Sequence, residues 1–184
     1  MDNGELVPPV NEEDHQAGHD DAPVTLVEFG DYQCPYCRSA YPVVEAVRLR
    51  LGNQLRFVWR QFPLEQVHPL ARQAAEASEA AGAQAAFWAM HEALLSDPMR
   101  LESDDLIQHA RDNGIDEYRF RGELQDHTYA PEVDADIDSG IRSGVPGTPT
   151  FFVNGRMYDG PRDVEGMTDA LIAAAREAVL QRGA

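Results

Sequence analysis

The stretch VTLVEFGDYQCPYC, residues 24–37, decides how this chain folds. Its first six residues, Val24–Phe29, form an apolar run rich in β-formers that stops at a glycine, which predicts a buried strand. After Cys37, apolar residues recur at steps of three and four positions as far as Leu51, which predicts one face of a helix. The two cysteines therefore stand where a strand ends and a helix begins.

The chain has only two cysteines, Cys34 and Cys37, in the order Cys-Pro-Tyr-Cys. A disulfide framework joins distant segments through several bridges, so this local pair is not one. The spacing suits a reversible dithiol, in which one thiolate attacks a substrate disulfide and its neighbour resolves the mixed disulfide. A thiol at the amino end of a helix has a pKa below the ~8.5 of ordinary cysteine. We therefore expect Cys34, the more exposed member, to be the nucleophile and Cys37 to be the resolving thiol.

A structural zinc site is the plainest alternative, because two cysteines at this spacing also bind metal. Such a site needs two further ligands, and the chain has no third cysteine. Its six histidines do not repeat at the spacing that a zinc site uses. His15 and His19 lie among acidic residues that could bind a divalent ion weakly, but solvated side chains are the simpler interpretation. We therefore expect no metal and no diffusible cofactor.

Glu28 is a candidate for proton transfer. It lies six positions before Cys34 and shares a strand face with Val24 and Leu26. A carboxylate on that apolar face would be desolvated, which raises its pKa and suits it to take the proton of Cys37 as the mixed disulfide resolves. If the strand lay at the edge of a sheet, Glu28 would meet water instead. The apolar neighbours favour burial.

Composition and charge limit the classes of partner. A length of 184 residues with 43% hydrophobic content fits one globular domain, or one domain with an insertion. The formal net charge of −17 argues against nucleic acid and anionic membranes as partners. No window reaches the ~18 consecutive apolar residues of a membrane helix, and the first thirty residues lack the pattern of a signal peptide. We therefore expect a cytoplasmic protein without membrane insertion, or an exported one if a leader has been removed.

The remaining segments predict an interrupted α/β arrangement. Residues 1–22 carry seven acidic residues and no Lys or Arg, so they are expected to form a flexible acidic arm. Residues 23–64 and 145–184 hold the β-rich runs and form the expected core. Residues 65–144 are rich in alanine and acids at helical spacing, which predicts a helical insertion.

Local signals mark the ends of several elements. Ser103 and Asp116 are expected to cap helices within the insertion. Asn154-Gly155 separates two short β-rich runs, which is the strongest short-range signal for a hairpin. Asp163 is expected to open the last helix.

Taken together, these features resemble the thioredoxin superfamily. The shared features are the strand, the Cys-Pro-Tyr-Cys motif at a helix start, a helical insertion, Thr148-Pro149 before a hairpin, and a final helix. More narrowly, they resemble the DsbA-like branch, whose thioredoxin core is interrupted by a helical domain. The resemblance implies an α/β, thioredoxin-like fold with an inserted helical domain. Residues 24–37 and 147–155 carry most of it.

The resemblance also implies a set of site residues. Pro149 would follow a cis peptide bond and lie against the cysteines, with Glu28 as the buried acid beneath them. The backbone beside Pro149 would pair with an extended substrate segment, and the hydroxyl of Thr148 would lie near the sulfurs. Pro35 needs no function at a first helical turn, because its missing donor is unused there. Tyr36 would offer an exposed ring to the substrate. The substrate-binding candidates are Thr148, Pro149, Pro35 and Tyr36.

Two departures leave the direction of electron flow open. The strongly oxidising members carry Pro-His between the cysteines, whereas Pro35-Tyr36 resembles glutaredoxins and some cytosolic or antiporter-fused DsbA-like proteins. Thr148 is more similar to the disulfide isomerases and Gram-positive relatives. We predict an oxidoreductase that acts on protein thiols or disulfides and is regenerated by a redox partner. The alternatives are a glutathione-dependent, glutaredoxin-like reductase, for which only Arg38 supplies nearby positive charge, and a non-catalytic thioredoxin-fold binding module.

Overall fold

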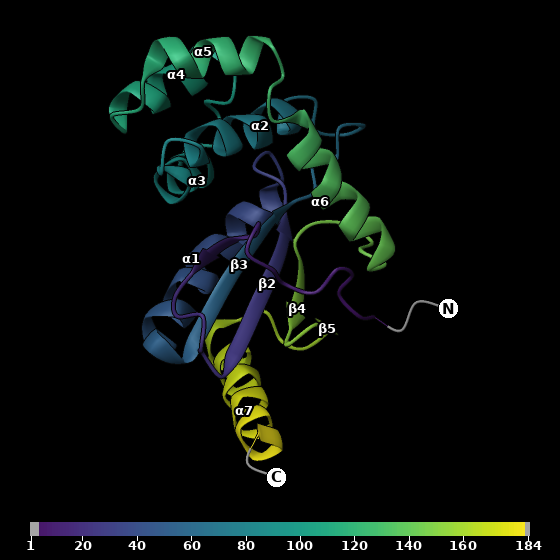
Figure 1. The fold of residues 1–184 in the computed structure, drawn as a ribbon. Coiled ribbons are helices and arrows are strands. Elements are labelled where there is room, and N and C mark those ends of the chain that lie inside the picture. The colour runs from purple at the N-terminus through teal and green to yellow at the C-terminus, as the bar shows by residue number, and fades with distance from the viewer. Residues whose placement is uncertain (1–3, 183–184) are drawn as a thin grey trace. The chain divides into compact units, whose positions relative to one another are not determined.

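The computed structural model describes residues 4–182, which divide into two compact units (Figure 1). The first, here called the sheet unit, contains the described residues 4–29, 39–60 and 139–182. The second, here called the helical unit, contains residues 30–38 and 61–138. Both cysteines therefore belong to the helical unit by this division, although the strand that precedes them belongs to the sheet unit.

A five-stranded sheet in the order β1-β3-β2-β4-β5 forms the centre of the sheet unit. Strand β1 runs antiparallel to β3, and β4 runs antiparallel to both β2 and β5. The predicted strands and hairpin are confirmed, whereas β1 was not expected. The strand bounds are β1 His15–Ala17, β2 Val24–Gly30, β3 Leu55–Gln61, β4 Thr150–Val153 and β5 Arg156–Tyr158.

Strand β2 is internal to the sheet, and every one of its residues is buried. An internal strand covered on both faces reads as a nearly continuous apolar run, which is the pattern of Val24–Phe29. The alternative that this strand lies at an edge is therefore wrong, and the burial predicted for Glu28 is confirmed at 2% exposure. Opposite Glu28 in the antiparallel register lies Phe151 of β4.

The turn between β4 and β5 shows why its two residues predict a hairpin. Asn154 and Gly155 both have positive φ, at 47° and 82°, as a tight hairpin turn with the right twist requires. Asparagine and glycine tolerate this region better than other residues. The Asn154 side chain also accepts the backbone N–H of Thr25 at 2.8 Å, which ties the turn to the start of β2.

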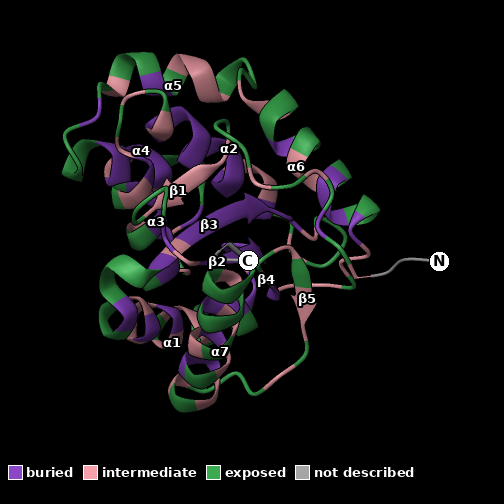
Figure 2. Ribbon diagram, turned by 60° about the horizontal axis from the view of Figure 1, so that its bottom comes forward, coloured by how far each residue is buried: buried purple, intermediate pink, exposed green. Residues whose placement is uncertain are grey.

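The helices follow the predicted pattern closely. The described helices are α1 Pro35–Leu51, α2 Ala71–Gly82, α3 Phe87–Ser96, α4 Ser103–Asp112, α5 Glu117–Gln125, α6 Ala130–Arg142 and α7 Val164–Arg182, with a 3-10 turn at Gly52–Gln54. Within residues 4–182, no helix combines the length and apolar composition needed to cross a membrane. Helix α2 is buried over most of its length (Figure 2). Its alanines allow it to contact α3, α4 and α5 together.

The predicted caps differ in outcome. The Asp116 side chain accepts the Arg119 N–H at 3.0 Å, which confirms it as the cap of α5. The Asp163 carboxylate likewise accepts the N–H of Gly166 at 2.9 Å at the start of α7. Ser103 is wrong as a cap, because it is already the first residue of α4 and Glu102 precedes it without a side-chain capping bond. Glu102 has an extended backbone and is the N-cap residue, so the cap lies one position earlier than the sequence predicts.

The N-terminal segment, which was expected to be a flexible arm, pairs with strands toward both edges of the sheet. Strand β1 pairs with β3, while Glu5 forms an antiparallel bridge with Arg156 of β5. The N–H of Leu6 donates to the Gly155 carbonyl at 2.8 Å. Backbone hydrogen bonds therefore place described residues of this segment along β3 and along β5.

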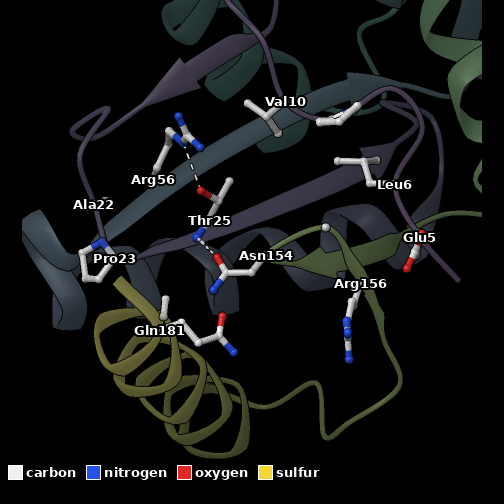
Figure 3. A pocket seen from close by; sticks show the side chains of 13 residues that line it. Glu5, Leu6, Val10, Ala22, Pro23, Thr25, Arg56, Asn154, Arg156 and Gln181 are labelled. Atoms are coloured by element: carbon white, nitrogen blue, oxygen red, sulfur yellow. Dashed lines mark hydrogen bonds between the residues drawn. The ribbon is translucent and has the colours of Figure 1, made fainter. Parts of the chain in front are cut away.

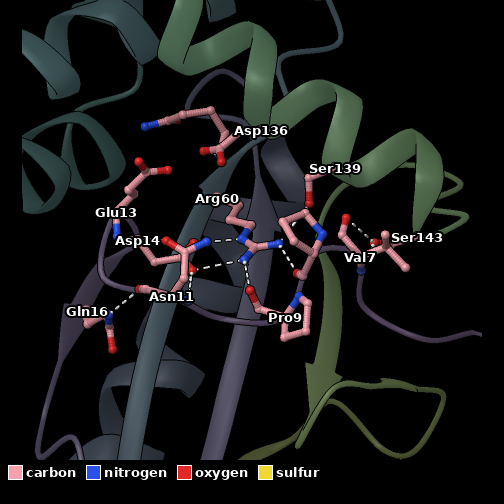
Figure 4. Close-up of polar contacts among 12 residues, drawn as sticks. Val7, Pro9, Asn11, Glu13, Asp14, Gln16, Arg60, Asp136, Ser139 and Ser143 are labelled. Carbon is pink, nitrogen blue, oxygen red and sulfur yellow. Dashed lines mark hydrogen bonds and ion pairs between the residues drawn. The ribbon is translucent and has the colours of Figure 1, made fainter.

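Arg60 of β3 holds the middle of the same segment (Figure 4). Its guanidinium binds both carboxylate oxygens of Asp14, at 2.7 and 2.9 Å, and donates to the Ser139 hydroxyl at 2.8 Å and to the Pro8 carbonyl at 3.0 Å. The side chains of Arg60 and Asp14 are only 2% and 5% exposed. Asp14 is therefore a buried ion-pair partner rather than one of the solvated acids expected around His15 and His19.

Candidate active site

The Cys-Pro-Tyr-Cys motif occupies the predicted place at the start of a helix. Cys34 immediately precedes α1, and its carbonyl accepts the Arg38 N–H at 3.1 Å, so it is the N-cap residue. Cys37 is the third residue of the helix. Neither cysteine is in a disulfide, and both are buried, at 2% and 0% exposure. The expected difference in exposure is thus very small, and the N-cap position is what distinguishes Cys34.

The sulfur of Cys37 accepts a backbone hydrogen bond. The N–H of Asp31 points to Cys37 Sγ, with nitrogen and sulfur 3.4 Å apart. A donor directed at a sulfur favours its negatively charged form. The turn that precedes the motif therefore contacts the second sulfur directly.

The Asp31 carboxylate organises this turn. Oδ1 accepts the N–H groups of Gln33 at 2.8 Å and Cys34 at 3.2 Å. Oδ2 accepts the Leu64 N–H at 2.9 Å and lies 2.7 Å from Nδ1 of His68. The Asp31 side chain is fully buried, and that of His68 is 19% exposed. Four donors thus surround one buried carboxylate beside the nucleophile candidate.

Two neighbours of Asp31 make further contacts within the helical unit. The buried Tyr32 hydroxyl lies 3.1 Å from Nδ1 of His91 in α3. The Gln33 side-chain oxygen accepts the Leu70 N–H at 2.7 Å, just before α2. Tyr32 is a core residue with 0% exposure. Consecutive side chains therefore fix the turn before the motif at separate points.

Sequence reasoning missed Asp31 and His68. An aspartate side chain often accepts the backbone N–H of the residue two positions further on, which forms an Asx-turn. Asp31 could therefore have been found from local sequence. His68 gives no such signal, since it lies 37 residues further along the chain. It lies in the turn before α2.

Thr148 and Pro149 lie just before β4 in the sheet unit. The bond between them is cis, as the resemblance implied. Arg162 donates to the Pro149 carbonyl at 3.3 Å and lies over the Phe151 ring, so the sequence search missed a contact of this segment. The expected proximity of Thr148, Pro149 and Glu28 to the sulfurs stays a prediction.

The two residues between the cysteines differ in exposure and position. Pro35 is the first helical residue, where its missing N–H is unused. Tyr36 is 73% exposed, as expected for a ring offered to a partner. Their contribution to substrate binding stays a prediction.

A separate pocket of about 620 Å³ lies within the sheet unit (Figure 3). Its lining includes Glu5, Thr25, Arg56, Asn154 and Arg156, but no residue of the Cys-Pro-Tyr-Cys motif. Thr25 stands near the start of β2, whereas the motif follows the end of that strand. In the described part of the chain, no cluster of three or more His, Cys, Asp and Glu side chains is arranged to hold a metal ion.

Comparison with protein families gives one match across most of the chain. The profile described as thioredoxin matches residues 10–173. The chain belongs to the thioredoxin family.

Three solved structures are similar over nearly their whole length. BdbD from Bacillus subtilis in its oxidised form has a TM-score of 0.81 at 24% identity, covering 94% of this chain and 98% of BdbD. A thioredoxin-like oxidoreductase from Silicibacter pomeroyi has a TM-score of 0.76 at 28% identity, covering 91% and 94%. Wolbachia pipientis alpha-DsbA1 has a TM-score of 0.80 at 16% identity, covering 98% and 99%. The DsbA-like fold predicted from the sequence is confirmed.

A curated relative with high sequence identity is a longer protein. A Na(+)/H(+) antiporter, NhaA 3, from Salinispora tropica is 43% identical over 96% of this chain. The chain spans 27%, about a quarter, of the length of that relative.

Proposed function

We propose that this chain is a thiol–disulfide oxidoreductase acting on protein thiols or disulfides through Cys34 and Cys37. The observation that carries the proposal is a buried dithiol at the N-terminus of α1, in a chain of the thioredoxin family. Orphan N–H groups and the helix dipole favour negative charge at that position. Cys34 is therefore suited to act as a thiolate nucleophile.

In the reducing direction, the Cys34 thiolate attacks one sulfur of a substrate disulfide. An S–S bond forms between Cys34 and the substrate as the substrate disulfide breaks, and one substrate thiolate leaves. Cys37 then loses its proton and attacks Cys34 Sγ, which releases the second substrate thiolate. The product is a Cys34–Cys37 disulfide, and two electrons have passed to the substrate. The oxidising direction runs the same steps backwards.

Other residues have supporting roles in this proposal. Glu28, a buried carboxylate in β2, takes the proton from Cys37 during resolution. Thr148 and Pro149 offer backbone to an extended substrate segment, and the exposed ring of Tyr36 packs against it. A separate redox partner must reduce or oxidise the pair after each turnover.

The test compares insulin reduction with oxidative refolding of a reduced protein, each with wild type, Cys34→Ser and Cys37→Ser. We expect wild type to be active in at least one assay, Cys34→Ser to be inactive in both, and Cys37→Ser to accumulate a mixed disulfide. Activity that requires glutathione would favour the glutaredoxin-like alternative. No activity in wild type would contradict the proposal and favour the binding module.

A further inference from the structure

The environment of Asp31 bears on the charge of the nucleophile. The Asp31 carboxylate accepts the Cys34 N–H at 3.2 Å, and the backbone carbonyl of Asp31 accepts the same N–H at 3.1 Å. A carboxylate and a thiolate would then share the positive end of α1. Like charges close together disfavour each other's ionised form, so Asp31 opposes the stabilisation that the helix gives to a Cys34 thiolate.

His68 can cancel that opposition. Its Nδ1 faces the Asp31 carboxylate at 2.7 Å and must carry the donated proton when the carboxylate is ionised. The charge of the pair then depends on the other ring nitrogen. With Nε2 protonated the pair is neutral, and without that proton it carries one negative charge.

Other titratable groups surround the motif within the helical unit. Burial acts to lower the pKa of Arg72 in α2, but hydrogen bonds to Asp134, Glu76 and Glu65 raise it overall. The positive charge of Arg72 is therefore paired with carboxylates. Further titratable or charged groups on the elements that carry or contact the turn include Tyr36, Cys37 and Arg38 on α1, Glu65 before α2, Glu79 on α2, His91 and Glu92 on α3, and Tyr32, whose hydroxyl lies 3.1 Å from Nδ1 of His91. None of these is bonded to the Asp31 carboxylate in the described part of the chain.

We infer that Asp31 and His68 form a positioning pair that sets the stability of the Cys34 thiolate and hence the redox equilibrium of the dithiol. The inference rests on the proposed thiol–disulfide chemistry and deepens it. The dithiol is the reduced form, so stabilising its thiolate makes the Cys34–Cys37 disulfide a stronger oxidant. Asp31 works against the thiolate, and protonated His68 works for it. The two side chains are thus expected to affect the equilibrium in opposite directions.

The experiment measures two properties of the full chain without a protein substrate. The first is the equilibrium between the Cys34–Cys37 disulfide with reduced glutathione and the dithiol with oxidised glutathione, in which two electrons move to the protein sulfurs. The second is the pH profile of Cys34 alkylation by iodoacetamide in a Cys37→Ala background. The variants are Asp31→Asn and His68→Gln. His127→Gln is the control, because His127 pairs with the Glu76 carboxylate at 2.8 Å elsewhere in the same unit.

For Asp31→Asn we expect a shift of about tenfold toward the dithiol, equivalent to about 30 mV, and Cys34 alkylation at lower pH. For His68→Gln we expect a several-fold shift toward the disulfide, because the amide cannot carry the positive charge that offsets the Asp31 carboxylate. His127→Gln should match wild type. If Asp31 and His68 only supported the local structure, both site variants would shift the redox equilibrium in the same direction.

The inference is overturned if both site variants shift the equilibrium in one direction, or if neither shifts it. Should Asp31→Asn fail to fold, the direction of the shift in His68→Gln decides alone. Failure of the proposed function looks different. In that case the glutathione equilibrium still responds to these variants, but wild type turns over no protein disulfide or thiol.

Discussion

At the scale of single residues, two buried carboxylates, Glu28 and Asp31, precede the start of α1 in the sequence. Glu28 stands in β2, where Val24 and Leu26 share its face, so its burial could be predicted from its apolar neighbours. The four-donor environment of Asp31 could not be predicted, because His68 and Leu64 come from a distant turn with no periodic pattern. Local sequence predicts which residues share a strand face, but it does not predict which turns lie close together in the folded chain.

Glu28→Gln tests the proton-transfer role at this scale. The amide keeps the shape of the side chain but cannot take the proton of Cys37, so resolution of the mixed disulfide should slow by about 10²-fold or more. Attack by Cys34 should keep its rate, because it needs no proton from Glu28. Quenched-flow measurement of the mixed disulfide lifetime across pH separates the two steps.

The matched control for this prediction is Glu165→Gln, an exposed acid in the first turn of α7. It should leave both steps unchanged. An unaltered mixed disulfide lifetime in Glu28→Gln over the whole pH range would remove Glu28 from the mechanism.

At the scale of elements, the hairpin and β1 show which strands are readable from sequence. Asn154-Gly155 specifies its turn through backbone conformations that few residues adopt, so the hairpin is predictable. Strand β1, His15–Ala17, has no β-branched or aromatic residue and exists through its pairing with β3. Its position depends on Gly18, which has a φ of 106° directly after the strand.

Gly18→Ala should therefore destabilise the chain more than Gly155→Ala. Both glycines have positive φ, which costs an alanine about 1 kcal/mol. A Cβ at Gly155 meets open space, whereas a Cβ at Gly18 would collide with the backbone carbonyl oxygen of Leu55. We expect a loss of about 1 kcal/mol for Gly155→Ala and a clearly larger loss for Gly18→Ala, measured by denaturant unfolding.

Hydrogen exchange adds a local readout to the same comparison. Gly18→Ala should increase amide exchange in β1, because the strand must shift away from β3 to relieve the collision. Gly122→Ala serves as the control, since Gly122 lies inside α5 with open space at its Cβ and should gain stability. Equal losses for Gly18→Ala and Gly155→Ala would mean that the contact with Leu55 does not fix β1.

At the scale of the whole molecule, the N-terminal segment is part of the sheet unit rather than an appendage. Its acidic composition correctly marks a segment without periodic structure, but composition could not reveal that Glu5 and β1 pair with β5 and β3. Unpaired strand edges invite association with other chains, and pairing within the chain satisfies their donors and acceptors. The segment therefore completes the hydrogen bonding of strands that are far apart in sequence.

Asp14→Ala tests what holds this segment in place. Arg60 is buried, and removing its carboxylate partner leaves a cation with the neutral oxygens of Ser139, Pro8 and Pro9 and the Phe29 ring, but no counter-charge among its contacts in the described part of the chain. Breaking a buried ion pair from one side costs about 3 kcal/mol, so Asp14→Ala should lower the free energy of unfolding by that order. Amide exchange at residues 4–17 should rise together with it. Glu13→Ala, which removes the neighbouring exposed acid, should change the free energy of unfolding by less than about 0.5 kcal/mol.

The double variant Arg60→Met with Asp14→Leu separates the ion pair from simple loss of packing. Replacing both partners by apolar side chains of similar size removes the uncompensated charge, so stability should recover most of what Asp14→Ala loses. The N-terminal segment would then be held by its backbone pairing with β3 and β5 alone, and exchange at residues 4–17 should fall back toward the wild-type rate. An Asp14→Ala variant as stable as Glu13→Ala would show instead that backbone pairing already suffices and that Arg60 needs no carboxylate.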